Sequence, residues 1–174
     1  NLVQGVANQV AFKVTDKRGN SANINGTIYN SRREKVATTQ TIHQGMGRFT
    51  LTPAEGESYL MEITDEKGKV HPFNLPIAEA KGYAMTVNNM HPKQLEINLA
   101  HNGRMDTTRA LGLTVMCRGR VIQFEQIKWN GNSTTTLTIA KENLPEGINQ
   151  LTLFDTEGRI YADRLFFIKP TKQV

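Results

Sequence analysis

The chain has 174 residues, enough for one large β domain or two small ones. Because 38% of the residues are hydrophobic and 21% are charged, the composition predicts a packed core and excludes wholesale disorder. A single cysteine excludes an internal disulfide framework and a cysteine-rich zinc site, and no apolar run has the length of a membrane-spanning helix.

The net charge is +5, which raises the question of a nucleic-acid partner. The basic residues are scattered, however, and their densest runs are short: Lys17-Arg18, Arg32-Arg33-Glu34-Lys35 and Arg118-Gly119-Arg120. Solvated loop tips explain such runs better than a binding stripe does. We therefore expect no nucleic-acid partner.

Along the chain, apolar residues recur with a period of two, which is typical of strands that have one face on a core and one in water. The pattern is clearest at residues 10–14, 24–28, 59–63, 95–99 and 111–117. Helical periodicity is scarce. Only Pro76 to Lys81 and Ile139 to Leu144 are compatible with a single helical turn.

Turn sequences separate these segments at short intervals. Asp16, Asp65 and Asp155 each precede a glycine by three positions, so the aspartate can bond its own downstream backbone while glycine accepts a positive φ. Asn130-Gly131 predicts a β-hairpin, and Arg118-Gly119-Arg120 predicts another tight turn.

About seven candidate strands precede residue 80 and about seven follow it, which is too many for one small sandwich. We therefore predict an all-β protein with two tandem immunoglobulin-like β-sandwich domains, residues 1–79 and 80–174. The chain begins at Asn1 rather than Met and has no leader sequence, so we expect it to be a fragment or a mature segment of a larger protein.

No motif for catalysis or for a cofactor is present. The four histidines, His43, His71, His91 and His101, form no metal-ligand pattern and are expected on the surface or in loops. No serine lies in a nucleophile elbow, and the glycines form no phosphate loop. We therefore predict no enzymatic activity, no catalytic residue, no metal and no cofactor, and we assign no ligand-binding residue.

Two single residues have a structural and a functional interpretation. Cys117 is in phase with Leu113 and Val115, which favours a buried, inert thiol over a reactive one flanked by arginines. Trp129 is expected to pack on the sheet at a hairpin end. An exposed Trp129 would instead favour a carbohydrate-binding sandwich.

The segment His43-Gln44-Gly45-Met46-Gly47-Arg48-Phe49-Thr50-Leu51-Thr52-Pro53, with Val10 to Asp16 before it, resembles the macroglobulin-like (MG2-type) domains of alpha-2-macroglobulin relatives, above all those of Bacteroidetes cell-envelope proteins. We interpret Gly45-Met46-Gly47 as a tight turn that delivers Phe49 and Leu51 to a core, with Met46 filling a gap. Residues 144–155 and 163–168 match the same group less sharply.

The resemblance implies a macroglobulin-like first domain and a non-catalytic structural or interaction module of a larger bacterial envelope protein. It further implies a place in the periplasm, at the outer membrane or on the cell surface, with other domains of the parent chain or other envelope proteins as partners. Cys117 is followed by Arg118-Gly119-Arg120, so the thioester of some family members is absent. The alternatives are a carbohydrate-binding sandwich or part of a macroglobulin-type protease inhibitor.

Overall fold

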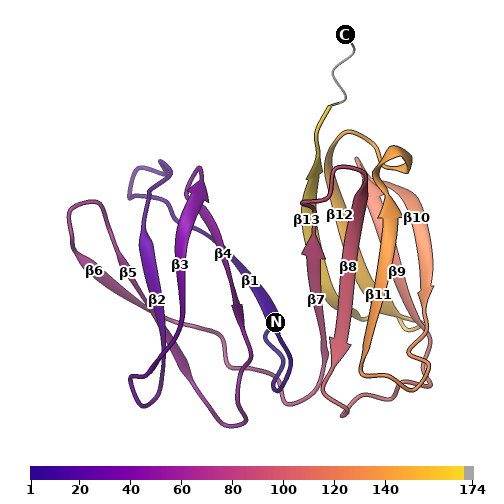
Figure 1. The fold of residues 1–174 in the computed structure, drawn as a ribbon, viewed down its shortest axis with the longest axis horizontal. Helices are drawn as coiled ribbons and strands as arrows, with labels where there is room; N and C mark the ends of the chain where they lie inside the picture. Colours follow the sequence, from indigo (N-terminus) through magenta and orange to yellow (C-terminus); the bar gives the residue numbers. More distant parts are fainter. Residues whose placement is uncertain (171–174) are drawn as a thin grey trace. The chain divides into compact units, whose positions relative to one another are not determined.

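Figure 1 shows the computed structural model of the protein, which describes residues 1–170. The chain divides into two compact units, Asn1–Ala80 and a second unit that begins at Lys81. The predicted boundary between residues 79 and 80 lies one residue before this division. Among residues 1–170 there are thirteen strands and one short 3₁₀-helix, so the protein is all-β, with six strands in the first unit and seven in the second.

The six strands of the first unit form one antiparallel sheet in the order β1-β4-β3-β2-β5-β6. The strands are β1 (Asn8–Lys13), β2 (Asn25–Asn30), β3 (Lys35–His43), β4 (Met46–Leu51), β5 (Tyr59–Thr64) and β6 (Val70–Asn74). Strand β3 belongs to both halves, since residues 35–40 pair with β2 and Thr41 and His43 pair with β4.

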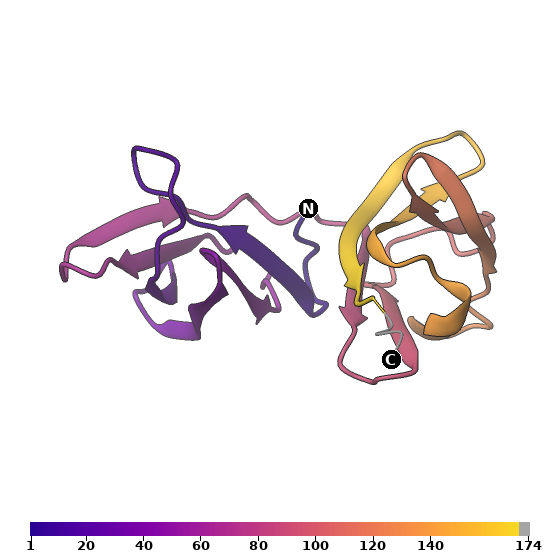
Figure 2. The ribbon, with the colours of Figure 1, turned by 90° about the horizontal axis from the view of Figure 1, so that it is seen from above.

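The sheet of the first unit curls, as Figure 2 shows, and side chains from both halves join one core. Phe49 and Leu51 come from β4, and Ile28, Met61 and Ile63 come from β2 and β5. The alternation predicted Ile28, Met61 and Ile63 as core residues, and the expected turn predicted Phe49 and Leu51. All five are buried. Because β3 pairs with strands of both halves, the first unit is not divided into two separate sheets, as a simple sandwich would be.

The turn between β3 and β4 is tight, but it lies one residue earlier than predicted. Gln44 and Gly45 have the positive φ angles, and a Cβ at Gly45 would collide with the carbonyl oxygen of Val14. A Cβ at Gly47 would collide with the Phe12 ring, so both glycines allow a close approach. Met46 fills no gap. It is 46% exposed, because it is the first outward residue of β4.

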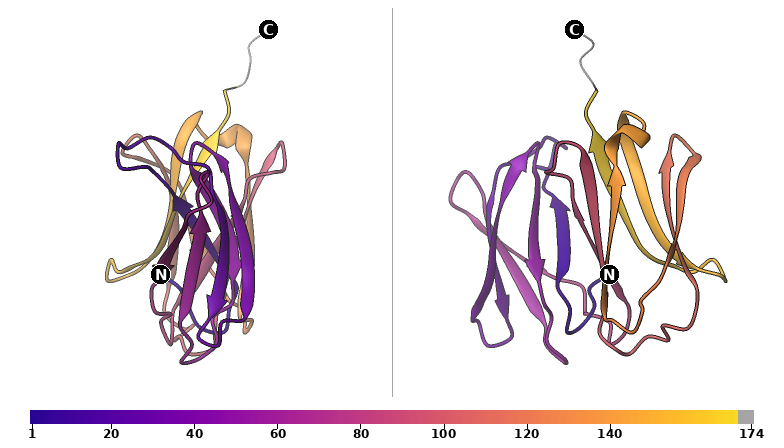
Figure 3. Two further views of the ribbon diagram at one scale, coloured as in Figure 1. Left: turned by 90° about the vertical axis from the view of Figure 1, so that its left-hand side faces the viewer. Right: turned by 45° about the vertical axis from the view of Figure 1, so that its right-hand side comes forward.

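The seven strands of the second unit form a sandwich of two antiparallel sheets, β11-β8-β7 and β10-β9-β12-β13, seen from further sides in Figure 3. The strands are β7 (Tyr83–Asn88), β8 (Gln94–His101), β9 (Leu111–Cys117), β10 (Arg120–Ile127), β11 (Thr134–Ala140), β12 (Gly147–Asp155) and β13 (Ile160–Ile168). Strands one, two and five in one sheet and three, four, six and seven in the other make an immunoglobulin-like topology.

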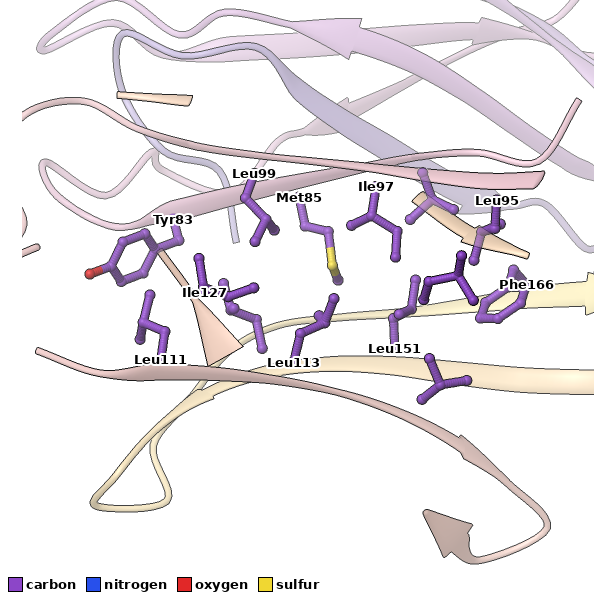
Figure 4. Close-up of a cluster of buried hydrophobic side chains, with 14 of the residues drawn as sticks. Tyr83, Met85, Leu95, Ile97, Leu99, Leu111, Leu113, Ile127, Leu151 and Phe166 are labelled. Carbon is purple, nitrogen blue, oxygen red and sulfur yellow. The ribbon is translucent and has the colours of Figure 1, made fainter. Parts of the chain in front are cut away.

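The core of this sandwich lies between its two sheets, and Figure 4 shows its side chains meeting there. Leu95, Ile97 and Leu99 of β8 and Leu151 and Leu153 of β12 are fully buried. Burying each such side chain contributes roughly 1.5–3 kcal/mol to folding. The predicted alternation is confirmed in β8. In β9 the predicted core residues are buried, but Gly112 and Thr114 on the other face are buried as well, so that face is not in water.

The three Asp-x-x-Gly turns are built alike. In each turn, the aspartate Oδ1 accepts hydrogen bonds from the backbone N–H groups two and four residues later, at 2.8–2.9 Å. The glycine N–H donates to the aspartate carbonyl, and Gly19, Gly68 and Gly158 all have positive φ. The turn prediction at Asp16, Asp65 and Asp155 is confirmed.

Two local predictions are wrong. Asn130 and Gly131 form a turn with positive φ, but it does not close a hairpin, because β10 pairs with β9 and β11 pairs with β8 in the other sheet. Packing of the two sheets therefore decides the pairing of these strands. Residues 76–81 are not helical, since Glu79 bridges Val3 instead. The other expected helical turn is confirmed as a 3₁₀-helix, Lys141–Asn143.

Candidate functional site

The structure does not bring the histidines together. His43 and His91 are exposed, and His71 Nε2 lies 3.0 Å from Asp65 Oδ2. His101 is only 7% exposed, which contradicts the expected surface or loop position. It ends β8, where its ring accepts a hydrogen bond from the Gly103 N–H and closes the following loop. Within residues 1–170, no group of His, Cys, Asp and Glu side chains is arranged to hold a metal ion.

Trp129 lies in an aromatic cluster rather than on the surface. Its ring stacks on Tyr83 with centroids 5.6 Å apart, and the His101 ring meets it edge-on at 4.7 Å. Only 4% of Trp129 is exposed, so its predicted packing on the sheet is confirmed. The carbohydrate-binding hypothesis required an exposed Trp129, and the structure contradicts that requirement.

Cys117 has the burial that the alternation predicted. It is 5% exposed at the end of β9, and its Sγ–H donates to the Ile148 carbonyl at 3.5 Å. A thiol with this environment is almost completely removed from solvent. The structure therefore favours a packing role for Cys117.

One surface of the second unit carries an unusual amount of exposed apolar side chain. Of the fourteen exposed large hydrophobic residues among residues 1–170, seven lie on β10, β12 and β13. Six of them occupy positions that point away from the core of the four-stranded sheet. We call this surface the apolar outer face: Val121, Phe124, Ile148, Ile160, Leu165 and Phe167.

Strand register places some of these residues side by side and connects others through intervening side chains of the same face. Ile148 pairs directly with Phe167, and Leu165 pairs with Gln150 in the next row. Gln150 pairs in turn with Met116, which pairs with Val121, so one row crosses all four strands. Side chains at such paired positions are in contact distance, because their Cβ atoms lie about 4.5–5.5 Å apart.

A second apolar group of the same face is built around a glycine. The rings of Phe124 and Phe154 have centroids 6.3 Å apart and lie across Gly112. A Cβ at Gly112 would lie 2.8 Å and 2.9 Å from these two rings. Glycine at this position therefore lets two phenyl groups cover the strand and widen the apolar surface.

One feature of the sequence indicates this face, although the search for alternating residues did not take it into account. In β13, Leu165 and Phe167 point outward while Phe166 and Ile168 are buried, so this strand is apolar on both sides. A strand with one solvated face would carry polar residues at the outward positions. Large exposed apolar patches occur at protein–protein and membrane interaction sites and in ligand-binding grooves, so this face is the candidate site of the second unit.

The fold and this face together describe an all-β protein of immunoglobulin-like architecture with an exposed apolar sheet face. Among residues 1–170, no helix has the length and apolar character needed to cross a membrane. No family model matches the chain, and no curated protein matches it.

The solved structures that resemble the chain include the following two, both at low identity. A biofilm-associated protein, BSP domain, is 15% identical with a TM-score of 0.40, over 99% of this chain and 29% of that one. A pullulanase complexed with maltotriose, from Anoxybacillus sp. LM18-11, is 10% identical with a TM-score of 0.29, over 93% of this chain and 24% of that one. The chain thus spans less than a third of either structure. Neither similarity assigns a family or a ligand to it.

Proposed function

We propose that this chain is a non-catalytic structural and interaction module that positions neighbouring domains of a larger protein. The observation that carries the proposal is the apolar outer face of the four-stranded sheet. Leu165 is 69% exposed and Ile148 is 64% exposed, although both are the kind of side chain that folding normally removes from water.

The proposed parent is a macroglobulin-like protein of a bacterial cell envelope, in the periplasm, at the outer membrane or on the cell surface. The support is the sequence resemblance of residues 43–53, together with residues 144–155 and 163–168, to domains of Bacteroidetes envelope proteins. Two of these segments have a clear structural role. Residues 43–53 contain the crowded glycine turn and β4, and residues 144–155 lead into the central strand β12.

The proposed occupant of the apolar outer face is another domain of the parent chain. Covering this face removes apolar surface from water, which stabilises the docked state by roughly 25 cal/mol per Å² before the cost of ordering is subtracted. Of the polar side chains on this face, Thr114 is buried, whereas Thr152 is partly exposed and its cross-strand partner Asp163 is exposed, so these two can form hydrogen bonds across an interface.

Hydroxyl-radical footprinting tests this assignment. The chain of residues 1–174 and the longer parent protein are oxidised under the same conditions, and the modification of Leu165 and Phe167 is compared. We expect both side chains to be modified in the short chain and protected in the parent. Phe73 of β6, which is 52% exposed in the first unit, serves as the internal control. Equal modification of Leu165 and Phe167 in the two proteins would refute the docking of a parent domain.

A further inference from the structure

A pocket in the second unit has no role in the proposed docking. Its volume is ≈ 310 Å³, near the lower end of the range of ~300–1,000 Å³ that is usual for ligand sites. Basic side chains outnumber acidic ones in its wall, with Lys81, Arg104, Arg109 and Arg159 against Asp106 and Asp155. The remaining wall includes the aromatic rings of Tyr83 and Tyr161.

The two acidic groups are already engaged in local hydrogen bonds. Asp155 Oδ1 accepts from the N–H groups of Glu157 and Arg159, both at 2.9 Å, and its Oδ2 accepts from the Tyr161 hydroxyl at 3.0 Å. Burial tends to raise the pKa of Asp155, but these hydrogen bonds outweigh it and lower the pKa, so the carboxylate stays charged.

Asp106 is engaged in the same way. Its Oδ1 accepts from the Thr108 N–H at 3.0 Å and from the Thr108 hydroxyl at 2.6 Å. These hydrogen bonds lower the pKa of Asp106. The contact of its other oxygen, Oδ2, with Arg109 Nε is a loose 3.6 Å. Neither aspartate therefore occupies all the hydrogen-bond donors of the basic side chains around it.

The basic groups retain unused donors. The Arg159 guanidinium lies over the Tyr161 ring, 5.2 Å from its centroid, which orients the guanidinium plane without using its N–H groups. Within residues 1–170, no protein acceptor bonds the side-chain N–H groups of Arg159, the Nη groups of Arg109 or the ammonium of Lys81. Three cations with free donors thus face one small pocket.

We propose that this pocket binds a small organic ligand through a carboxylate group. A guanidinium presents two parallel N–H donors that match the two oxygens of a carboxylate, and Arg109 and Arg159 each provide such a pair. The apolar and aromatic parts of the wall, Met105, Leu111 and Tyr161, take the carbon skeleton of the ligand. An inorganic anion would leave this apolar wall unused.

Titration by NMR tests the proposal, with glucuronate as the acidic probe, glucose as its neutral counterpart and inorganic phosphate as the inorganic anion. We expect glucuronate to shift the side-chain Nε–Hε signals of Arg109 and Arg159 in a saturable way. Glucose should shift neither signal, and phosphate should bind more weakly than glucuronate. Because the pocket is open to solvent, added salt should weaken the binding.

Variants locate the effect in the pocket. Arg109→Gln and Arg159→Gln should each weaken glucuronate binding by about tenfold or more, the loss expected for a charged hydrogen bond of about 1.5–3 kcal/mol. Arg18→Gln, in the Asp16 turn of the first unit, should leave it unchanged. Arg159→Lys keeps the positive charge but lacks the paired N–H donors, so its affinity for glucuronate should lie between those of the unsubstituted chain and Arg159→Gln. Unfolding followed by Trp129 fluorescence shows that each variant is folded.

The proposal is overturned if glucuronate shifts neither arginine signal, or if glucose shifts them equally. It is also overturned if Arg18→Gln weakens binding as much as Arg109→Gln does, because the effect would then come from net charge alone. Binding of phosphate as tightly as glucuronate refutes the role of the apolar wall.

Discussion

Asn149 offers the sharpest test of how the second unit is held together. Its side chain is 0% exposed in β12, and its Nδ2 donates to the carbonyls of Pro145 at 2.8 Å and Gly147 at 3.2 Å. These two hydrogen bonds tie the loop after the 3₁₀-helix to the start of a central strand. Asn149 Oδ1 is buried and has no hydrogen-bond partner among residues 1–170.

Asn149→Ala removes both hydrogen bonds and takes this donor away from two partly buried carbonyl oxygens. Each lost bond lowers the free energy of unfolding by about 0.5–1.5 kcal/mol, and a carbonyl left without any partner costs up to ~3 kcal/mol. The same substitution removes the unpartnered Oδ1, which offsets part of this loss. We expect a net destabilisation of about 1–3 kcal/mol, or a fall in Tm of at least ~4 °C.

Asn149→Asp should lower the free energy of unfolding further, because it keeps the shape of the side chain but places a buried carboxylate against two carbonyl oxygens. At pH 7 we expect a loss of about 3–5 kcal/mol. Burial and the carbonyls raise the pKa of the introduced carboxyl in the folded state, so the folded protein binds the extra proton. The difference in free energy of unfolding between Asn149→Asp and the unsubstituted chain should therefore become smaller as the pH falls from 7 towards 5.

Urea unfolding of the full chain, followed by the fluorescence of Trp129, measures these effects. Trp129 is the only tryptophan and lies in the core of the second unit, so its signal reports on that unit. Asn143→Ala, an exposed position of the same loop, is the matched control and should change stability by less than about 0.5 kcal/mol. Equal stability of the Asn149→Ala and Asn143→Ala variants would refute the reasoning.

Three further predictions concern the same unit. The hydrogen-bonded Asp155 carboxylate has a lowered pKa, so its contribution to stability is present above the ordinary value of 3.8 and is lost as the pH falls below it. The free energy of unfolding of Asp155→Asn in urea should therefore depend less on pH in that range than that of the unsubstituted chain, and an equal dependence would contradict this role of Asp155. Leu151→Ala should cost about 2–5 kcal/mol in the same assay and Leu165→Ala less than ~0.5 kcal/mol, and equal costs would contradict the assignment of the two faces. Cys117 should react with a thiol reagent only in urea, and rapid reaction of the native chain would show that the thiol is accessible.

Much of the local structure is predictable from neighbouring residues alone. The alternation in residues 95–99 and 111–117 identifies buried strand faces, because side chains in a strand point to opposite sides in turn. The Asp155 turn follows from an aspartate that bonds its own backbone and a glycine that accepts positive φ. These features depend on contacts within a few residues, so the sequence carries them directly.

The pairing of strands is a different matter. The turn at Asn130-Gly131 has the backbone of a hairpin turn, yet it connects two sheets, because β10 completes its hydrogen bonds with β9 and β11 with β8. Likewise, the sequence shows that residues 165–168 are apolar but not which of them remain exposed. Exposure depends on which strands lie opposite one another across the core.

The amino-acid sequence by itself determined the all-β class, the buried faces of individual strands, the aspartate turns and the burial of Cys117 and Trp129. Only the tertiary structure decided that β3 is shared within the first unit, that one sheet face of the second unit is apolar, and that Arg109 and Arg159 line one pocket. The physical reason is the distance along the chain between the residues that interact. Side-chain alternation and turn hydrogen bonds are set by adjacent residues, whereas a face and a pocket are assembled from strands far apart in the chain.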